Sequence, residues 1–142
     1  MAPIIEELYV ETGIATFEFR DFAFLGDGSV LAAEANRCAA DQGKFWEYHD
    51  LLMYNIDNPA LDGATRPTFD ALAEHLGLDM TEFGQCMDGR VHQAEVEQSR
   101  ADASARGVTG TPTIALNEEL VTGIQTYGEL FDMIEELANQ QQ

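Results

Sequence analysis

The stretch VTGTPTIALN, residues 108–117, places a Thr-Pro pair directly before a run of residues that favour β-strands. Glycine, threonine and proline favour turns, and a proline is tolerated where a strand begins because its missing N–H removes no ladder hydrogen bond there. We therefore expect a bend at Thr111 and Pro112 and a strand over 112–117. A bend of this kind suggests that Pro112 lies beside a binding or reactive site. An arbitrary X-Pro bond is cis in only about 5% of cases, so local chemistry alone predicts a trans bond here.

Hydrophobic periodicity and turn residues predict the elements on either side of this stretch. Asp79 with Glu82, and Thr126 with Glu129, have the spacing of capping boxes that begin helices. A block of helices between strands predicts an α/β domain. In chain order we expect a helix end at 4–13, a strand at 14–24, helices at 30–42, 44–55, 68–76, 79–89 and 90–106, the strand at 112–117, a strand at 120–122 and a helix at 127–138.

The composition is strongly acidic. The 142 residues include 26 Asp and Glu against 7 Lys and Arg, for a net charge of −19, and Lys44 is the only lysine. Nucleic acids and anionic lipids require a basic surface, so we expect neither as a partner. Two interpretations of the charge remain open: an ordinary acidic surface, or adaptation to high salt, where screening weakens the repulsion between like charges.

The length fits one domain that can bury a hydrophobic core without a metal. The first residues, MAPIIEELYVE, contain early glutamates and no basic segment, so they do not have the pattern of a signal peptide. No apolar run approaches the ~20 residues of a transmembrane helix.

The two cysteines, Cys38 and Cys86, lie in separate predicted helices and form no C-x-x-C motif. From the residues alone three alternatives stay open: two buried thiols, one structural disulfide, or a redox-active pair. The histidines show no ligand spacing relative to each other or to the cysteines, which argues against a metal site. No phosphate-binding loop or G-x-S-x-G motif is present, so we expect no cofactor.

Several longer motifs together indicate a family. TGTPT and the following strand, turn and helix, through LVTGIQTYGELFDMIEEL, look like the second half of a thioredoxin fold. The stretch FRDFAFLGDGSVLAAEANRCAADQGKFWEYHDLLM (19–53) closely resembles the DsbA-type thiol–disulfide oxidoreductases. LAEHLGLDMTEFGQCMDG (72–89) is similar to the second-cysteine region of one branch of that family.

The resemblance implies a single thioredoxin-like domain over 1–142, with a helical insertion at about 29–107. It implies that Thr111–Pro112 is a cis-proline site whose backbone binds substrate peptide like an added strand. It also implies a structural disulfide between Cys38 and Cys86, protein or peptide thiols as substrates, and a location outside the cytoplasm, where disulfides persist.

The sequence departs from the family because it contains no C-x-x-C at the start of a first helix. We therefore expect a domain that lacks the N-terminal central strand and the start of the first helix, as a fragment or a short form. We therefore assign no catalytic residue and expect the chain alone to be redox-inactive. Whether the chain is an enzyme stays open. The alternatives are a non-catalytic module that binds a peptide or partner at the proline loop, and a slow redox switch at the cysteine pair. The missing strand also predicts a homodimer, in which a second chain covers the exposed strand edges.

Overall fold

The computed structural model describes residues 2–55, 63–121 and 126–140. It divides the chain into two compact units, one made of residues 1–20 and 108–142 and the other of residues 21–107. The assignment of one domain with an insertion at about 29–107 stays a prediction. Among the described residues, no helix combines the length and the apolar character needed to cross a membrane.

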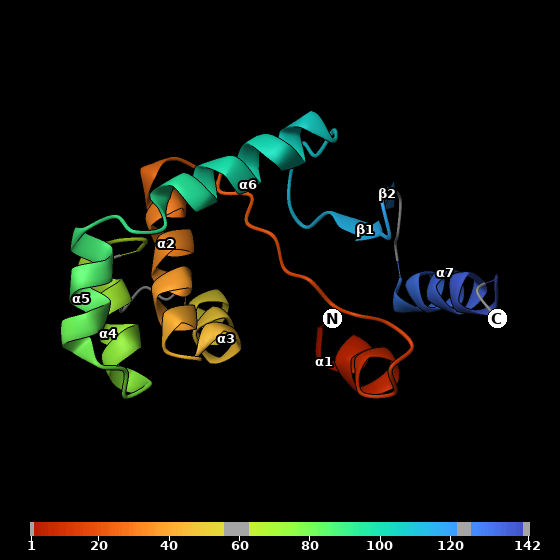
Figure 1. The fold of residues 1–142 in the computed structure, drawn as a ribbon, viewed down its shortest axis with the longest axis horizontal. Helices are drawn as coiled ribbons and strands as arrows, with labels where there is room; N and C mark the ends of the chain where they lie inside the picture. The colour runs from red at the N-terminus through yellow and green to blue at the C-terminus, as the bar shows by residue number, and fades with distance from the viewer. Residues whose placement is uncertain (1, 56–62, 122–125, 141–142) are drawn as a thin grey trace. The chain divides into compact units, whose positions relative to one another are not determined.

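The described residues of the unit 21–107 form five helices, and Figure 1 shows them around α2. Helix α2 contacts each of the other four, so its sequence decides much of the packing. Three of its five buried residues, Ala35, Cys38 and Ala39, are small and allow neighbouring helices to approach closely. The helices are α2 (Asp27–Asp41), α3 (Phe45–Asn55), α4 (Arg66–His75), α5 (Met80–Asp88) and α6 (Gln93–Ala105).

The hydrophobic core of this unit is formed by side chains from α2 to α5. Tyr48, Phe69 and Phe83 are completely buried in it, and the Tyr48 hydroxyl donates a hydrogen bond to the Phe69 carbonyl at 3.0 Å. The other core residues are Ala35, Cys38, Ala39, Leu52, Leu72, Ala73, Leu78 and Met87. Burial of this many apolar side chains is the main force that holds the five helices together.

The other unit contains a β-hairpin and helices from both ends of the chain (Figure 1). Strand β1 (Ile114–Leu116) pairs antiparallel with β2 (Glu119–Val121), with Leu116 opposite Glu119 across the turn. Asn117 begins the turn with φ 54°, a conformation that asparagine tolerates better than most residues. The helices are α1 (Ala2–Ile5), which continues into the π-helical turn η1 (Glu6–Val10), and α7 (Tyr127–Gln140).

The predicted helices and hairpin are present, with ends shifted by a few residues. Helix α2 begins at Asp27 rather than at residue 30, and α6 begins at Gln93 rather than at residue 90. The end of the second predicted strand, residue 122, and most of the loop expected at 56–67 lie outside the described residues.

The strand expected at 14–24 is a wrong prediction, because the structure assigns no strand to these residues. The alternation of apolar and polar residues there fits an extended chain. A strand, however, also requires a neighbour that forms its ladder hydrogen bonds, and the sheet of the described residues contains only β1 and β2.

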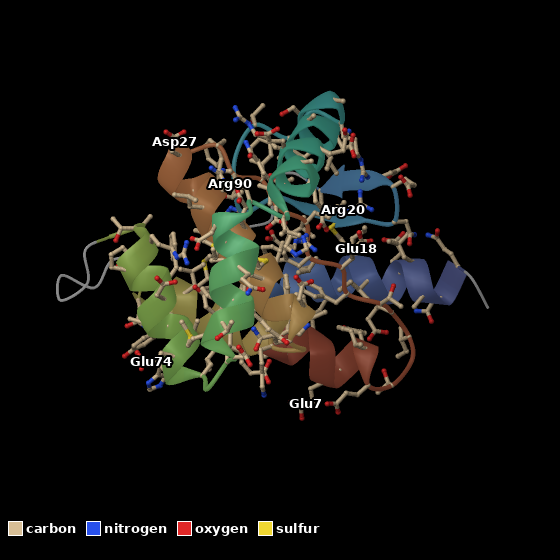
Figure 2. All side chains as sticks on the ribbon, turned by 60° about the vertical axis from the view of Figure 1, so that its left-hand side comes forward. Glu7, Glu18, Arg20, Asp27, Glu74 and Arg90 are labelled. Atoms are coloured by element: carbon tan, nitrogen blue, oxygen red, sulfur yellow. A yellow bond between two sulfur atoms is a disulfide. The ribbon has the colours of Figure 1, made fainter. Side chains whose placement is uncertain are left out.

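The acidic side chains are spread over both units. Glu7, Asp27 and Glu74 are exposed and point into solvent in Figure 2. Because each unit carries exposed carboxylates, the charge of −19 is not confined to one segment of the chain.

Candidate functional site

The Thr-Pro segment lies in an exposed loop that leads into β1. The peptide bond between Thr111 and Pro112 is cis, as the family resemblance implies and contrary to the trans bond that local chemistry alone predicts. Both residues are exposed, as is Thr113. The Thr113 hydroxyl donates a hydrogen bond to the Gly110 carbonyl at 2.6 Å and closes the loop on itself. The loop therefore presents its backbone and small side chains to solvent.

A small apolar cluster anchors the strand that follows the loop. Ile114 and Leu116 of β1 pack against it, so the end of the loop is attached to a buried framework. The buried members of this cluster are Ile5, Tyr9, Leu130 and Ile134. An exposed loop on an anchored strand is suited to binding because the loop is accessible while its end is held in place.

Cys38 and Cys86 form a disulfide that joins α2 to α5, with their Cα atoms 5.9 Å apart. Of the three alternatives that the residues left open, the structure thus contains a disulfide, and no free cysteine remains. Cys38 is only 1% exposed and belongs to the core, whereas Cys86 is partly exposed at its edge. The two sulfurs therefore differ in access to solvent.

A histidine that sequence reasoning did not assign lies beside this disulfide. The ligand atoms of Cys38, Cys86 and His92 all lie within 4.8 Å of one another. His92 precedes α6, so three separate segments of the chain bring these groups together. The only local signal was the spacing of His92 and Glu95, which allows one side chain to reach the other across a helical turn.

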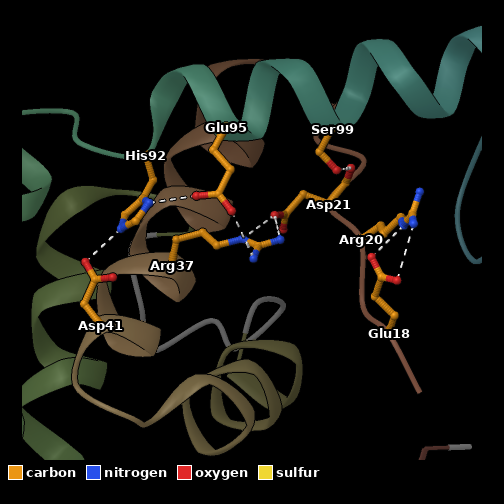
Figure 3. Close-up of polar contacts among 8 residues, drawn as sticks. All are labelled: Glu18, Arg20, Asp21, Arg37, Asp41, His92, Glu95 and Ser99. Atoms are coloured by element: carbon orange, nitrogen blue, oxygen red, sulfur yellow. Dashed lines mark hydrogen bonds and ion pairs between the residues drawn. The ribbon is translucent and has the colours of Figure 1, made fainter. Parts of the chain in front are cut away.

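Carboxylates hold both nitrogens of the His92 ring, as Figure 3 shows. Nδ1 lies 2.9 Å from a Glu95 oxygen, and Nε2 lies 2.8 Å from Asp41 Oδ2. Burial acts to lower the pKa of His92, but the hydrogen bonds to Asp41 and Glu95 outweigh it and raise the pKa above its usual value. The ring is therefore fixed in orientation and surrounded by negative charge.

The network continues from Glu95 to the start of this unit (Figure 3). Arg37 contacts Glu95 at 3.3 Å and Asp21 at 2.6 Å, and Asp21 is 4% exposed. The Ser99 hydroxyl donates to the Asp21 carbonyl at 2.8 Å. Burial raises the pKa of the Asp21 carboxyl although the bond to Arg37 opposes it. These contacts connect α2 and α6 through polar side chains.

Comparisons with known proteins indicate one family. A thioredoxin family model matches residues 2–136. The chain is 25% identical over 136 residues to disulfide bond formation protein D of Bacillus subtilis, covering 94% of this chain and 61% of that protein. It is 34% identical over 119 residues to Na(+)/H(+) antiporter NhaA 3 of Salinispora tropica, covering 81% of this chain and 17% of the antiporter. The chain thus spans less than two thirds of the length of these relatives.

A solved structure shows the same fold. The oxidised form of BdbD from Bacillus subtilis superposes with a TM-score of 0.84 at 23% sequence identity, covering 96% of this chain and 76% of that one. The fold is therefore thioredoxin-like, rich in helices and with a small sheet.

Proposed function

The chain belongs to the thioredoxin family, within its DsbA-type thiol–disulfide oxidoreductases, and from this premise we propose that it binds extended protein substrates for disulfide exchange. The Thr111–Pro112 loop is the binding surface. The observation that carries the proposal is the exposure of both residues at the start of an anchored strand. An unfolded polypeptide would lie along this loop and pair with its backbone as an additional strand.

In this proposal the substrates are protein thiols or disulfides, and the compartment is extracytoplasmic. The disulfide between Cys38 and Cys86 supports an oxidising compartment because disulfides persist there. The similarity to the antiporter covers 17% of that protein and does not extend the proposal to ion transport.

The 142 residues by themselves carry out no exchange in this proposal. Both cysteines of the sequence are joined between two helices, and the Cys38 sulfur lies in the core. Rapid exchange instead needs an accessible, low-pKa thiolate. Insulin reduction and the oxidation of a model dithiol measure this directly. Turnover that disappears in Cys86→Ser would show that the chain exchanges disulfides with its own cysteine pair.

A binding assay tests the loop. Ribonuclease that is unfolded by reduction and S-methylation supplies an extended chain that cannot exchange disulfides. We expect saturable binding to this probe, a loss of at least ~10-fold in affinity in Pro112→Ala, and no change in Pro67→Ala, a control at the start of α4. Circular dichroism confirms that both variants are folded. Equal affinity of Pro112→Ala and the wild type would contradict the assignment of the loop.

The alternative function is a non-catalytic module that binds a folded partner through the same loop. The two proposals differ in the form of the bound protein. A surface for extended substrates binds S-methylated ribonuclease and does not bind native ribonuclease. If folded proteins bind the loop and unfolded chains do not, the module is the better description.

A further inference from the structure

We propose that Cys38, Cys86, His92 and Asp41 form a Zn²⁺ site when the disulfide is reduced. The site shares no residue with the Thr111–Pro112 loop, and its metal binding does not require peptide binding. It is gated by redox state, because the same two sulfurs either bond to each other or bind the metal.

Three of the four ligands are already close together. Ligand atoms of both cysteines and His92 lie within 4.8 Å of one another. Zinc binds thiolate sulfur at about 2.3 Å and imidazole nitrogen at about 2.0 Å, which puts pairs of ligands in a tetrahedral site roughly 3.5–4 Å apart. Because the helices hold the two Cα atoms 5.9 Å apart, side-chain rotation alone can bring the freed sulfurs to this spacing.

The fourth ligand comes from the end of α2. Asp41 Oδ2 lies 3.7 Å from Cys86 Sγ and 2.8 Å from His92 Nε2. The same oxygen is thus near both the more exposed sulfur and the histidine, and Nε2 lies on this side of the ring. Two thiolates, an imidazole and a carboxylate are a ligand set that zinc favours.

Glu95 orients the histidine from the other side. Its Oε2 atom lies 2.9 Å from His92 Nδ1, which leaves Nε2 to bind the metal. A carboxylate on the distal nitrogen of a zinc-bound histidine fixes the tautomer and makes the ligand more basic. Glu95 is therefore a positioning residue for this site.

The surrounding charge favours a cation. Asp21, Asp41 and Glu95 are connected through hydrogen bonds and ion pairs that include one guanidinium, that of Arg37 (Figure 3). Three carboxylates lie beside one guanidinium and the ring of His92, so the charge beside the sulfurs stays negative even when that ring is protonated. A divalent cation bound there would compensate it.

Reduction of the Cys38–Cys86 disulfide is balanced when an external dithiol is the reductant. The external dithiol gives two electrons and two protons to the Cys38–Cys86 disulfide and becomes a disulfide itself. The two protein thiols then release their protons as Zn²⁺ forms bonds to both sulfurs. In the reverse direction an external disulfide takes two electrons from the two thiolates and two protons from solvent and becomes a dithiol, which re-forms the Cys38–Cys86 bond and releases Zn²⁺.

Metal titration of the full chain in both redox states tests the proposal. The protein is reduced with a phosphine, which avoids a competing thiol, and titrated with Co²⁺ and Zn²⁺ under anaerobic conditions. We expect one Co²⁺ per reduced chain, with the visible spectrum of tetrahedral thiolate coordination and displacement by Zn²⁺. The oxidised chain should show no such spectrum. Equal binding in both states, or no binding in the reduced state, overturns the proposal.

Variants assign the ligands. His92→Gln should lower Zn²⁺ affinity at least ~10-fold, and Glu95→Gln should lower it by about 10-fold through loss of the orienting contact. His75→Gln, at an exposed position at the end of α4, is the matched control and should bind as the wild type does. Unchanged affinity in His92→Gln overturns the assignment.

The reduced chain could lose its fold, so a second measurement is needed. If the reduced chain unfolds without metal, the site predicts that Zn²⁺ restores its circular dichroism spectrum, because metal that binds only the native state stabilises it. If Zn²⁺ fails to restore the fold, or restores it equally in His92→Gln, the proposal is wrong.

Discussion

The guanidinium of Arg90 donates two hydrogen bonds to the carboxylate of Glu34, from Nε to Oε2 at 2.7 Å and from Nη2 to Oε1 at 2.6 Å. Glu34 is 1% exposed within α2, whereas the Arg90 side chain is 40% exposed. The hydrogen bonds to Glu34, more than its charge, raise the pKa of Arg90. The buried carboxylate of Glu34 is therefore paired by a residue that lies outside the helices, after α5.

Arg90→Gln should destabilise the chain by about 2–3 kcal/mol. Removal of one partner from a fully buried pair costs about 3–5 kcal/mol, and the partial exposure of Arg90 lets water reach the remaining carboxylate and reduces this cost. Urea denaturation measures the change. Arg100→Gln, at an exposed position on α6, should change stability by less than about 0.5 kcal/mol. Adding Glu34→Gln to Arg90→Gln should recover part of the loss, and a further loss would contradict this explanation.

Tyr48→Phe tests the polar contact inside the hydrophobic core. The Tyr48 hydroxyl is buried and donates to the Phe69 carbonyl. Its loss should cost about 1 kcal/mol near neutral pH, the usual contribution of such a bond. Tyr54→Phe is the control because Tyr54 is 87% exposed.

The same variant should change the dependence of stability on alkaline pH. Burial, with a smaller contribution from Asp70, raises the pKa of Tyr48 above its usual value. The unfolded chain ionises this tyrosine from about pH 10, whereas the folded chain keeps it protonated. Its contribution to stability is therefore complete below pH 10 and is lost as the pH rises further, by at most about 1.4 kcal/mol per pH unit. Tyr48→Phe should remove that part of the slope, and a slope equal to the wild type would contradict the predicted ionisation.

Stability should increase with salt because the chain carries a net charge of −19. Screening shortens the Debye length from about 10 Å at 0.1 M to about 3 Å at 1 M, which weakens repulsion between the exposed carboxylates. A melting series from low to molar KCl measures the effect. A continued rise in melting temperature at molar salt favours adaptation to high salt. A plateau once repulsion is screened favours an ordinary acidic surface.

Homodimer formation stays a prediction. It is based on the small number of strands in the sheet. Within the described residues the sheet has only β1 and β2, and a two-stranded sheet is marginally stable by itself. A second chain could pair with one of its edges. Sedimentation equilibrium should show a dimer at micromolar concentration. Replacing the exposed Ala115 of β1 with proline, which lacks the N–H of a ladder, should shift the equilibrium to monomer if β1 is the edge that pairs.

Features with local causes were predicted correctly from the sequence. The Asp79 side chain accepts hydrogen bonds from the backbone N–H groups of Thr81 and Glu82 at the start of α5, so the N-cap half of the predicted capping box is confirmed. The Asp79 N–H donates to Gln42 Oε1 instead of to Glu82, so the reciprocal half of the box is replaced by a distant contact. Before α7, the Thr126 N–H donates to a Glu129 oxygen, and the Glu129 N–H donates to the Thr126 hydroxyl. The Asp79 cap and the box at Thr126 and Glu129 join residues two or three positions apart, so a short stretch of sequence is enough to predict them.

Features that depend on distant contacts were not predicted. His92 and Asp41 are 51 residues apart, and the local spacing of His92 and Glu95 gives no sign of the contact with Asp41. The pairing of Cys38 with Cys86 was implied by resemblance, while the residues themselves allowed three alternatives. The strand expected at 14–24 failed for a related reason, since alternation fixes the faces of a strand but not its hydrogen-bonding partner.

Removal of the disulfide should destabilise the chain substantially. Cys38 and Cys86 are 48 residues apart, and a loop of this length restricts the unfolded chain by about 4 kcal/mol in the entropy model. Cys38→Ala with Cys86→Ala should therefore shift the urea midpoint of the oxidised protein to a lower concentration. Reductant should lower the midpoint of the wild type and leave that of the double variant unchanged. If reductant leaves the wild-type midpoint unchanged as well, the packing of α2 against α5 holds the helices together without the disulfide, and its structural role would be contradicted.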